Sequence, residues 1–168
     1  MKKIIAMLLA LSLVFCLAAC TTTPETPDNK PAEEGFSITY NGTKIGLDYL
    51  MADVLVGLGE AVTYTESPSC AFDGLDKTYG YQSLNIQTYT RDGEDYVYCF
   101  WFVDDLHNDA KTAEGICIGS AKADVDAAYG SENYNGTNAY QISKGKGQLT
   151  IILENDLVSS IQYVLLTN

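Results

Sequence analysis

The prediction of the fold starts from Gly42-Thr43-Lys44-Ile45-Gly46, which returns in similar form as Gly115-Ile116-Cys117-Ile118-Gly119. A helical pattern follows each of these two pentapeptides. After the first, apolar residues recur at the i, i+3, i+4 and i+7 spacing of a helix with one buried face, and Gly59 supplies a helix stop. After the second, a shorter apolar stripe ends at Gly130. The chain therefore predicts an internal repeat in which each unit begins with one helix.

Three strand patterns follow each predicted helix. Those of the first unit cover residues 79–82, 84–90 and 96–103, with a hairpin turn at Arg91-Asp92-Gly93-Glu94. Those of the second unit cover residues 139–143, 149–154 and 158–166, with a turn at Asn155-Asp156. We therefore expect an α+β fold of two tandem repeats, 36–104 and 113–168. Each repeat is a helix plus a three-stranded antiparallel meander, and together they form one curved sheet with the helices on one face.

A short export signal precedes the predicted domain. Lys2 and Lys3 come before an apolar run over residues 4–19, which is shorter than the ~20 residues that a membrane-spanning helix needs. A charged start followed by a short apolar core is typical of a signal peptide that is removed. The run closes on Leu17-Ala18-Ala19-Cys20, which resembles the lipobox of bacterial lipoproteins. This resemblance implies cleavage before Cys20 and a diacylglycerol on its sulfur.

The segment 20–35 is rich in Pro, Thr and Glu, a composition that stays extended and solvated. Two acyl chains hold a protein stably on a membrane, at ~0.8 kcal/mol per buried methylene. We therefore expect a signal peptide at 1–19, a lipidated Cys20 with a disordered tether at 20–35, and a single α+β domain at 36–168. This places the protein on the extracytoplasmic face of the cell membrane. The whole chain also looks like a group of lipoproteins of Gram-positive anaerobes.

Charge and composition narrow the classes of function. The 168-residue chain is 46% hydrophobic, which excludes a disordered protein, and its net charge is −12. The predicted domain, 36–168, holds seven basic and eighteen acidic residues, a balance of −11. Such a domain does not bind nucleic acid through phosphate attraction. We therefore expect a folded, acidic domain with no nucleic-acid partner.

Three cysteines lie in the predicted domain: Cys70, Cys99 and Cys117. An odd number means at least one free thiol or an intermolecular bond. Cys99 lies in an apolar strand pattern and is typical of a small core residue. Cys70 lies in a polar loop where Lys77 is the only local cation that would lower its pKa. Three interpretations stay open: inert thiols, a disulfide between two of the three, and a reactive Cys70.

No pattern in the sequence is typical of a metal site or of an active site. Asp104, Asp105, His107 and Asp109 contain metal-binding groups, but their spacing fits neither a zinc pair nor an EF-hand. We interpret this cluster as a solvated acidic linker. A Gly-rich phosphate loop, a nucleophile elbow and a His-paired serine do not occur. The sequence therefore predicts no catalytic residue, no metal and no cofactor.

Aromatic residues are the strongest remaining signal, because the chain contains twelve tyrosines and one tryptophan. Amphipathic aromatics on a sheet suit a binding face, although tyrosine also favours strands for packing reasons alone. One face of the strand 96–103 should cover the helices, and the other is the candidate surface. The candidate binding residues are Tyr79, Tyr81, Tyr89, Tyr96, Tyr98 and Trp101.

A Gly-x-x-Ile-Gly opening, a short helix ending in Gly and a three-stranded meander resemble the repeat of β-lactamase-inhibitory proteins. The same layout, over residues 42–166, is similar to the small lipoprotein subunit of the outer-membrane barrel-assembly machine. These resemblances imply binding to another protein through an exposed sheet face, without catalysis. Together with the lipobox they favour a lipid-anchored, non-catalytic module that binds a protein or another cell-envelope partner. The alternative function is a thiol-dependent enzyme or redox protein that uses Cys70.

Overall fold

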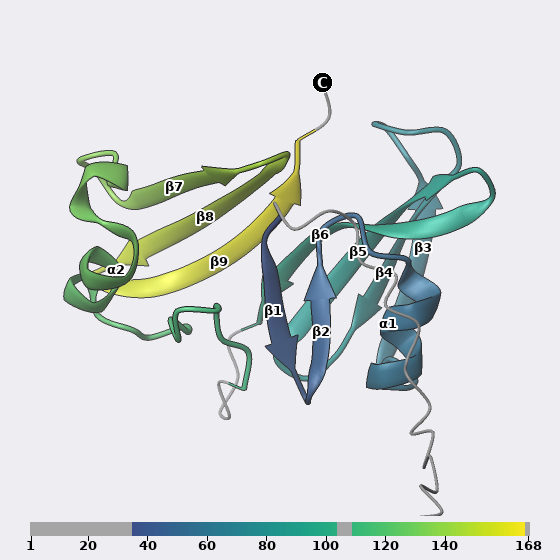
Figure 1. Ribbon diagram of the computed structural model, residues 1–168, viewed down its shortest axis with the longest axis horizontal. Coiled ribbons are helices and arrows are strands. Elements are labelled where there is room, and N and C mark those ends of the chain that lie inside the picture. Colours follow the sequence, from purple (N-terminus) through teal and green to yellow (C-terminus); the bar gives the residue numbers. More distant parts are fainter. Residues whose placement is uncertain (1–34, 104–108, 167–168) are drawn as a thin grey trace, which may run out of the picture.

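A computed structural model describes residues 35–103 and 109–166. The α-helices are α1 (Met51–Leu58) and α2 (Lys122–Tyr129), and a short 3-10 turn, η1 (Ser131–Asn133), follows the second (Figure 1). The strands of the first half are β1 (Ser37–Tyr40), β2 (Thr43–Gly46), β3 (Thr63–Pro68), β4 (Leu75–Gly80), β5 (Leu84–Arg91) and β6 (Glu94–Phe102). Those of the second half are β7 (Ala139–Lys144), β8 (Gly147–Glu154) and β9 (Leu157–Leu165).

Seven of these strands form one antiparallel sheet in the order β3-β4-β5-β6-β9-β8-β7. Its two halves meet where β6 pairs with β9. That junction consists of three directly opposed pairs: Cys99 with Val164, Phe100 with Tyr163, and Trp101 with Gln162. Strands β1 and β2 pair only with each other and form a separate two-stranded sheet.

The predicted fold of two helix-plus-three-strand repeats is wrong. Within the described residues the structure is mostly β, with nine strands in two sheets and only two α-helices. The first helix is followed by four strands of the main sheet rather than three, because Thr63–Pro68 is also a strand. All six residues of this edge strand are exposed, so it lacks the alternation of apolar and polar residues that reveals a half-buried strand.

The two pentapeptides that suggested the repeat also adopt different structures. The first forms β2, which pairs with β1 through a turn at Asn41 and Gly42, whose φ angles are 49° and 79°. The second, residues 115–119, lies outside the strands and has positive φ at Gly115 and Gly119. The first pentapeptide lies beside a neighbouring strand, β1, that pairs with it residue by residue. The backbone groups of the second bond within their own loop and, through the Gly119 amide, to the Val158 carbonyl, so they do not form a strand ladder.

Several local predictions are confirmed. The turns at residues 91–94 and 155–156 join β5 to β6 and β8 to β9, and each contains two residues with positive φ, as tight hairpins require. Gly59 and Gly130 cap the C-termini of α1 and α2 with φ of 74° and 83°. Glycine adopts these angles without steric cost, which explains why the helices end there.

One face of the seven-stranded sheet, the covered face, carries the hydrophobic core. The β1–β2 hairpin and α1 lie on the same side of β4–β6 (Figure 1). Ile38 and Ile45 of the hairpin, Met51 of α1 and Val125 of α2 belong to the same buried cluster as the inward-facing strand residues. A single row of directly opposed side chains shows how apolar this face is: Tyr64, Tyr79, Ile86, Phe100, Tyr163, Leu149 and Ile142.

Phe100 is the residue through which we test the junction between the halves. Its ring is fully buried and stacks on Tyr163 with the centroids 4.6 Å apart. Replacing it in the variant Phe100→Ala removes a large core side chain and leaves a cavity, so we expect a loss of about 3–5 kcal/mol in the free energy of unfolding, measured with urea. The exposed Gln141→Ala is the control and should change stability by less than about 0.5 kcal/mol. Similar losses in the two variants would contradict this account of the junction.

Candidate functional site

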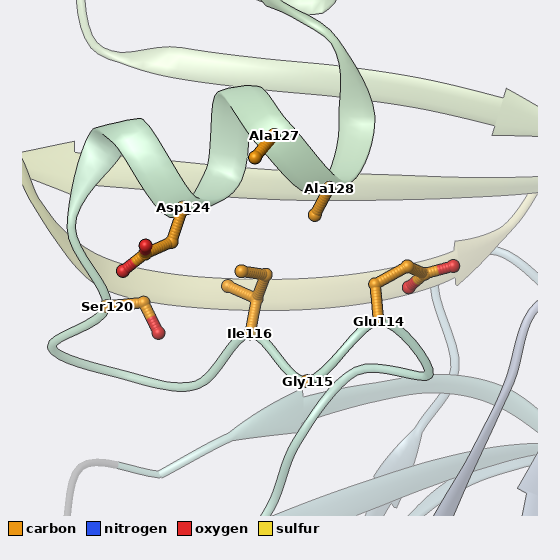
Figure 2. A pocket seen from close by; sticks show the side chains of 7 residues that line it. All are labelled: Glu114, Gly115, Ile116, Ser120, Asp124, Ala127 and Ala128. Carbon is orange, nitrogen blue, oxygen red and sulfur yellow. The ribbon is translucent and has the colours of Figure 1, made fainter.

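A shallow, open hollow of about 380 Å³ lies between α2 and the segment before it (Figure 2). Its lining residues are Glu114, Gly115, Ile116, Ser120, Asp124, Ala127 and Ala128. Local contacts already use its polar groups. Asp124 accepts a bond from the Ala121 amide, Ser120 accepts one from the Cys117 amide, and Glu114 accepts one from the Tyr129 hydroxyl. No cation lines the hollow, and its two carboxylates are not paired with a nucleophile, so its lining offers no arrangement for acid–base chemistry.

Cys70, the candidate reactive thiol, lies exposed in the loop between β3 and β4. The loop is closed by the Ser69 hydroxyl, which accepts bonds from the amides of Ala71 and Phe72. Lys77 donates to Asp95 at 2.7 Å, so its ammonium group is held by a carboxylate on β6. Lys77, the cation that the sequence offered to Cys70, therefore pairs with Asp95 instead.

The three cysteines of the described residues are free. Cys99 is only 2% exposed, and its sulfur lies 3.2 Å from the side-chain nitrogen of Gln162. Burial raises the pKa of the Cys99 thiol to about 11. Cys117 is half-buried, with its sulfur 3.6 Å from the Ser120 hydroxyl oxygen. Neither residue has the exposed, electropositive surroundings of a reactive thiol.

The remaining predictions of metal and lipid sites fall partly outside the described residues. Asp104, Asp105, His107 and Cys20 lie outside them, and only Asp109 of the predicted acidic linker lies within. In residues 35–103 and 109–166, no three His, Cys, Asp or Glu side chains are grouped closely enough to hold a metal ion. Within the same ranges, neither helix is long and apolar enough to cross a membrane.

The six aromatic residues proposed as a binding surface do not lie on one face. Tyr79 and Tyr81 pack against the core, where Tyr79 contacts Tyr64 and Tyr81 contacts Tyr40. The register places Tyr89, Tyr96 and Trp101 on the opposite side of the sheet, and Tyr98 occupies the β-bulge of β6 and contacts Tyr89. The candidate set is therefore divided between the two faces.

A cluster of aromatic residues closes one end of that opposite side. Phe72, from the loop that carries Cys70, stacks on Tyr89 at 4.7 Å. The Tyr89 hydroxyl donates to Asp48 at 2.6 Å, and burial together with this carboxylate raises the pKa of Tyr89 to about 12. Arg91 bonds to Asp48 and lies 3.9 Å above the Tyr96 ring. The polar groups of Tyr89, Arg91 and Asp48 bond to one another, and the rings pack together. The cluster therefore forms a fixed edge of this side of the sheet.

The uncovered side of the seven-stranded sheet, the open face, carries two rows of directly opposed residues that cross all seven strands. The first, the tryptophan row, consists of Thr63, Gly80, Asn85, Trp101, Gln162, Thr150 and Gln141. The second, the cysteine row, consists of Thr65, Thr78, Gln87, Cys99, Val164, Gln148 and Ser143.

None of these fourteen positions carries a charge, and hydroxyl or amide side chains occupy ten of them. All are exposed or half-buried except Gly80 and Cys99. The charged residues of this side, such as Asp76, Glu94 and Glu154, lie at or near strand ends. The open face is therefore a neutral, polar strip within an acidic domain.

Trp101 lies at the centre of this strip. It is half-buried, and its direct neighbours across the strands are two amides, Asn85 on β5 and Gln162 on β9. Beyond Asn85, Gly80 leaves room for its neighbours: a Cβ atom there would lie 2.2 Å from the Thr63 hydroxyl oxygen and 2.9 Å from the Asn85 amide oxygen. Two polar atoms therefore converge over a residue that has no side chain.

The sequence predicted Trp101 as a binding residue but not the amides and hydroxyls around it. Their signal was present in strands such as Leu84-Asn85-Ile86-Gln87, where apolar residues alternate with uncharged polar ones. The alternation shows which side chains point away from the core. Only the order of the strands in the sheet shows that these side chains lie in one row. Comparisons with family models, with curated proteins and with solved structures found no match to this chain.

The burial of Cys99 and the exposure of Cys70 predict a large difference in thiol reactivity. We expect iodoacetamide at pH 8 to label Cys70 quickly in the folded protein and to leave Cys99 unlabelled, because the raised pKa of Cys99 keeps the thiolate scarce. Mass mapping of the cysteine peptides measures each site, and the urea-unfolded protein, in which both react, is the control. Equal labelling of the two sites in the folded protein would contradict the prediction.

Proposed function

We propose that the protein is a non-catalytic binding module, held on the outer face of the cell membrane by a lipid on Cys20, and that the open face is its binding surface. The observation that carries this proposal is the pair of uncharged rows that crosses all seven strands. The lipobox-like stretch that ends at Cys20 supports the anchor. The tether in 20–35 would hold the domain away from the lipid headgroups.

Desolvation explains why the lack of charge matters. A partner that covers a surface removes water from it, and removing water from a charged group costs far more than removing it from an amide or hydroxyl that finds a hydrogen bond. Binding surfaces are accordingly depleted in charged residues at their centres. Residues 36–168 carry a balance of −11, yet none of this charge falls in the two rows. The open face is thus the part of this acidic domain best suited to being covered.

The alternative function, a thiol-dependent enzyme or redox protein, receives no comparable support. Cys70 is exposed, but Lys77, the basic residue that follows it in the sequence, is bonded to Asp95. A reactive thiol needs a cation or a base beside it. A non-catalytic module is the function that the described geometry favours.

The anchor is tested on the protein isolated from its own membranes. We expect the mature chain to begin at Cys20 with a diacylglycerol on the sulfur, which mass spectrometry of the N-terminal peptide detects. The variant Cys20→Ser should lose the lipid, whereas Cys70→Ser should keep it as a matched control. An unmodified Cys20 peptide, or a mature chain that begins at another residue, would remove this part of the proposal.

The binding surface is tested by photo-crosslinking in living cells. A diazirine amino acid is placed at Gln87, which lies next to Cys99 in the cysteine row, or at Val56, which is 83% exposed on α1. Because the carbene reacts with any close bond, we expect a species of higher mass from position 87 and none from position 56. Equal crosslinking from both positions, or none from position 87, would rule out the open face as the binding surface.

A further inference from the structure

We infer that the open face binds an extended, uncharged glycan that lies along the tryptophan row, across all seven strands. This inference rests on the proposed function, since it names the chemical class of the partner for the same surface. Three features of the two rows carry it: their length, the chemistry of their side chains, and the residues that they lack.

The length of the rows suits a linear polymer. Neighbouring strands lie 4.7–4.9 Å apart, so seven strands place their opposed side chains along a line of about 29 Å. The tryptophan row offers a side chain to this line at every strand except β4, where Gly80 stands. An extended chain can contact all of these groups at once, whereas a compact small molecule would reach only a few.

The chemistry of the rows matches that of sugar rings. A sugar ring presents C–H groups on its faces and hydroxyl groups around its edge. The face of an indole ring is the negative side of its quadrupole and attracts weakly positive hydrogens, so Trp101 can stack against the C–H face. Asn85 and Gln162, on either side of Trp101, each carry both donors and acceptors, as sugar hydroxyls do.

The space above Gly80 adds a second polar point on the same line. Because the residue has no Cβ, the hydroxyl oxygen of Thr63 and the amide oxygen of Asn85 converge there. A hydroxyl that donates and accepts thus stands beside an amide oxygen that accepts, over the buried Gly80, and this pair can bond to a sugar hydroxyl. The tryptophan row thus combines one stacking surface with hydrogen-bonding groups on both sides of it.

The residues missing from the rows argue against other partners. An anionic polymer needs Arg or Lys, and neither occurs in the rows of this acidic domain. The centres of protein interfaces are rich in Tyr, Trp, Phe, Met and Arg, and of these the rows contain only Trp101. The tyrosines beside the rows contact Phe72, Arg91 and one another. A neutral, hydroxyl-rich ligand is the class that the surface fits.

The chemical nature of the species crosslinked at Gln87 tests this inference directly. We expect the adduct to persist after complete proteolysis, to be shortened by periodate, which cleaves neighbouring diols, and to release uncharged sugars on acid hydrolysis. An adduct that proteases digest to peptides would overturn the glycan and leave the binding module intact, and this includes an adduct with a second copy of the chain. An adduct of charged sugars would also overturn the inference. Absence of any adduct defeats the proposed function itself.

Variants of the full-length protein then locate the contact. A linear neutral polysaccharide with the sugar composition found in the adduct is the probe in affinity electrophoresis, and Trp101→Ala should weaken retention by about tenfold or more. Gly80→Ala provides a second variant that leaves Trp101 in place, because the new methyl group would displace Thr63 and Asn85. Val56→Ser is the matched exposed control and should retain full binding.

Since Trp101 is the only tryptophan of the chain, its fluorescence should also shift when the glycan binds to the unaltered protein. Unchanged retention of both open-face variants would overturn the inference.

Discussion

The pairing of β6 with β9 is the contact on which the rest of the sheet depends. Three opposed residue pairs join a four-stranded half to a three-stranded half, and the stacked rings of Phe100 and Tyr163 reinforce them on the covered side. Without this junction each half would leave its inner strand unpaired and its part of the core open to water. Because the pairing is in register, it also aligns the outer side chains of both halves. The continuous rows of the open face are a direct result of that alignment.

The β1–β2 hairpin decides which side of this sheet becomes the interior. It supplies buried side chains such as Ile38, Tyr40 and Ile45 and, with the two helices, covers the face that contains Phe100. The Tyr40 hydroxyl accepts a bond from the Ser83 amide, which ties the hairpin to the start of β5. With one face closed in this way, alternation along each strand leaves the other face to the hydroxyl and amide side chains of the two rows. The core and the candidate surface thus arise from the same alternation.

Local structure was largely predictable from the sequence, and long-range arrangement was not. Gly59, Gly93 and Gly130 marked helix ends and a hairpin because only a few residues tolerate positive φ. The sequence does not predict the strand β3, because all six of its residues are exposed and carry no periodic signal. The predicted repeat is wrong because Gly-x-x-Ile-Gly specifies two flexible points but no partner strand. For the candidate site, Trp101 was recognised as an aromatic residue, whereas its neighbours Asn85 and Gln162 belong to different halves and become neighbours only through the β6–β9 junction.

The absence of charge in the two rows has a consequence for how the surface responds to its surroundings. Dissolved salt screens interactions between exposed charges over a distance of about 10 Å at an ionic strength of ~0.1 M, but it has little effect on stacking or on hydrogen bonds between neutral groups. The acidic remainder of the domain repels anionic surfaces strongly in dilute medium and weakly in saline medium. The neutral strip presents the same surface in both. A neutral surface of this kind would hold an uncharged partner about equally well at low and at high ionic strength.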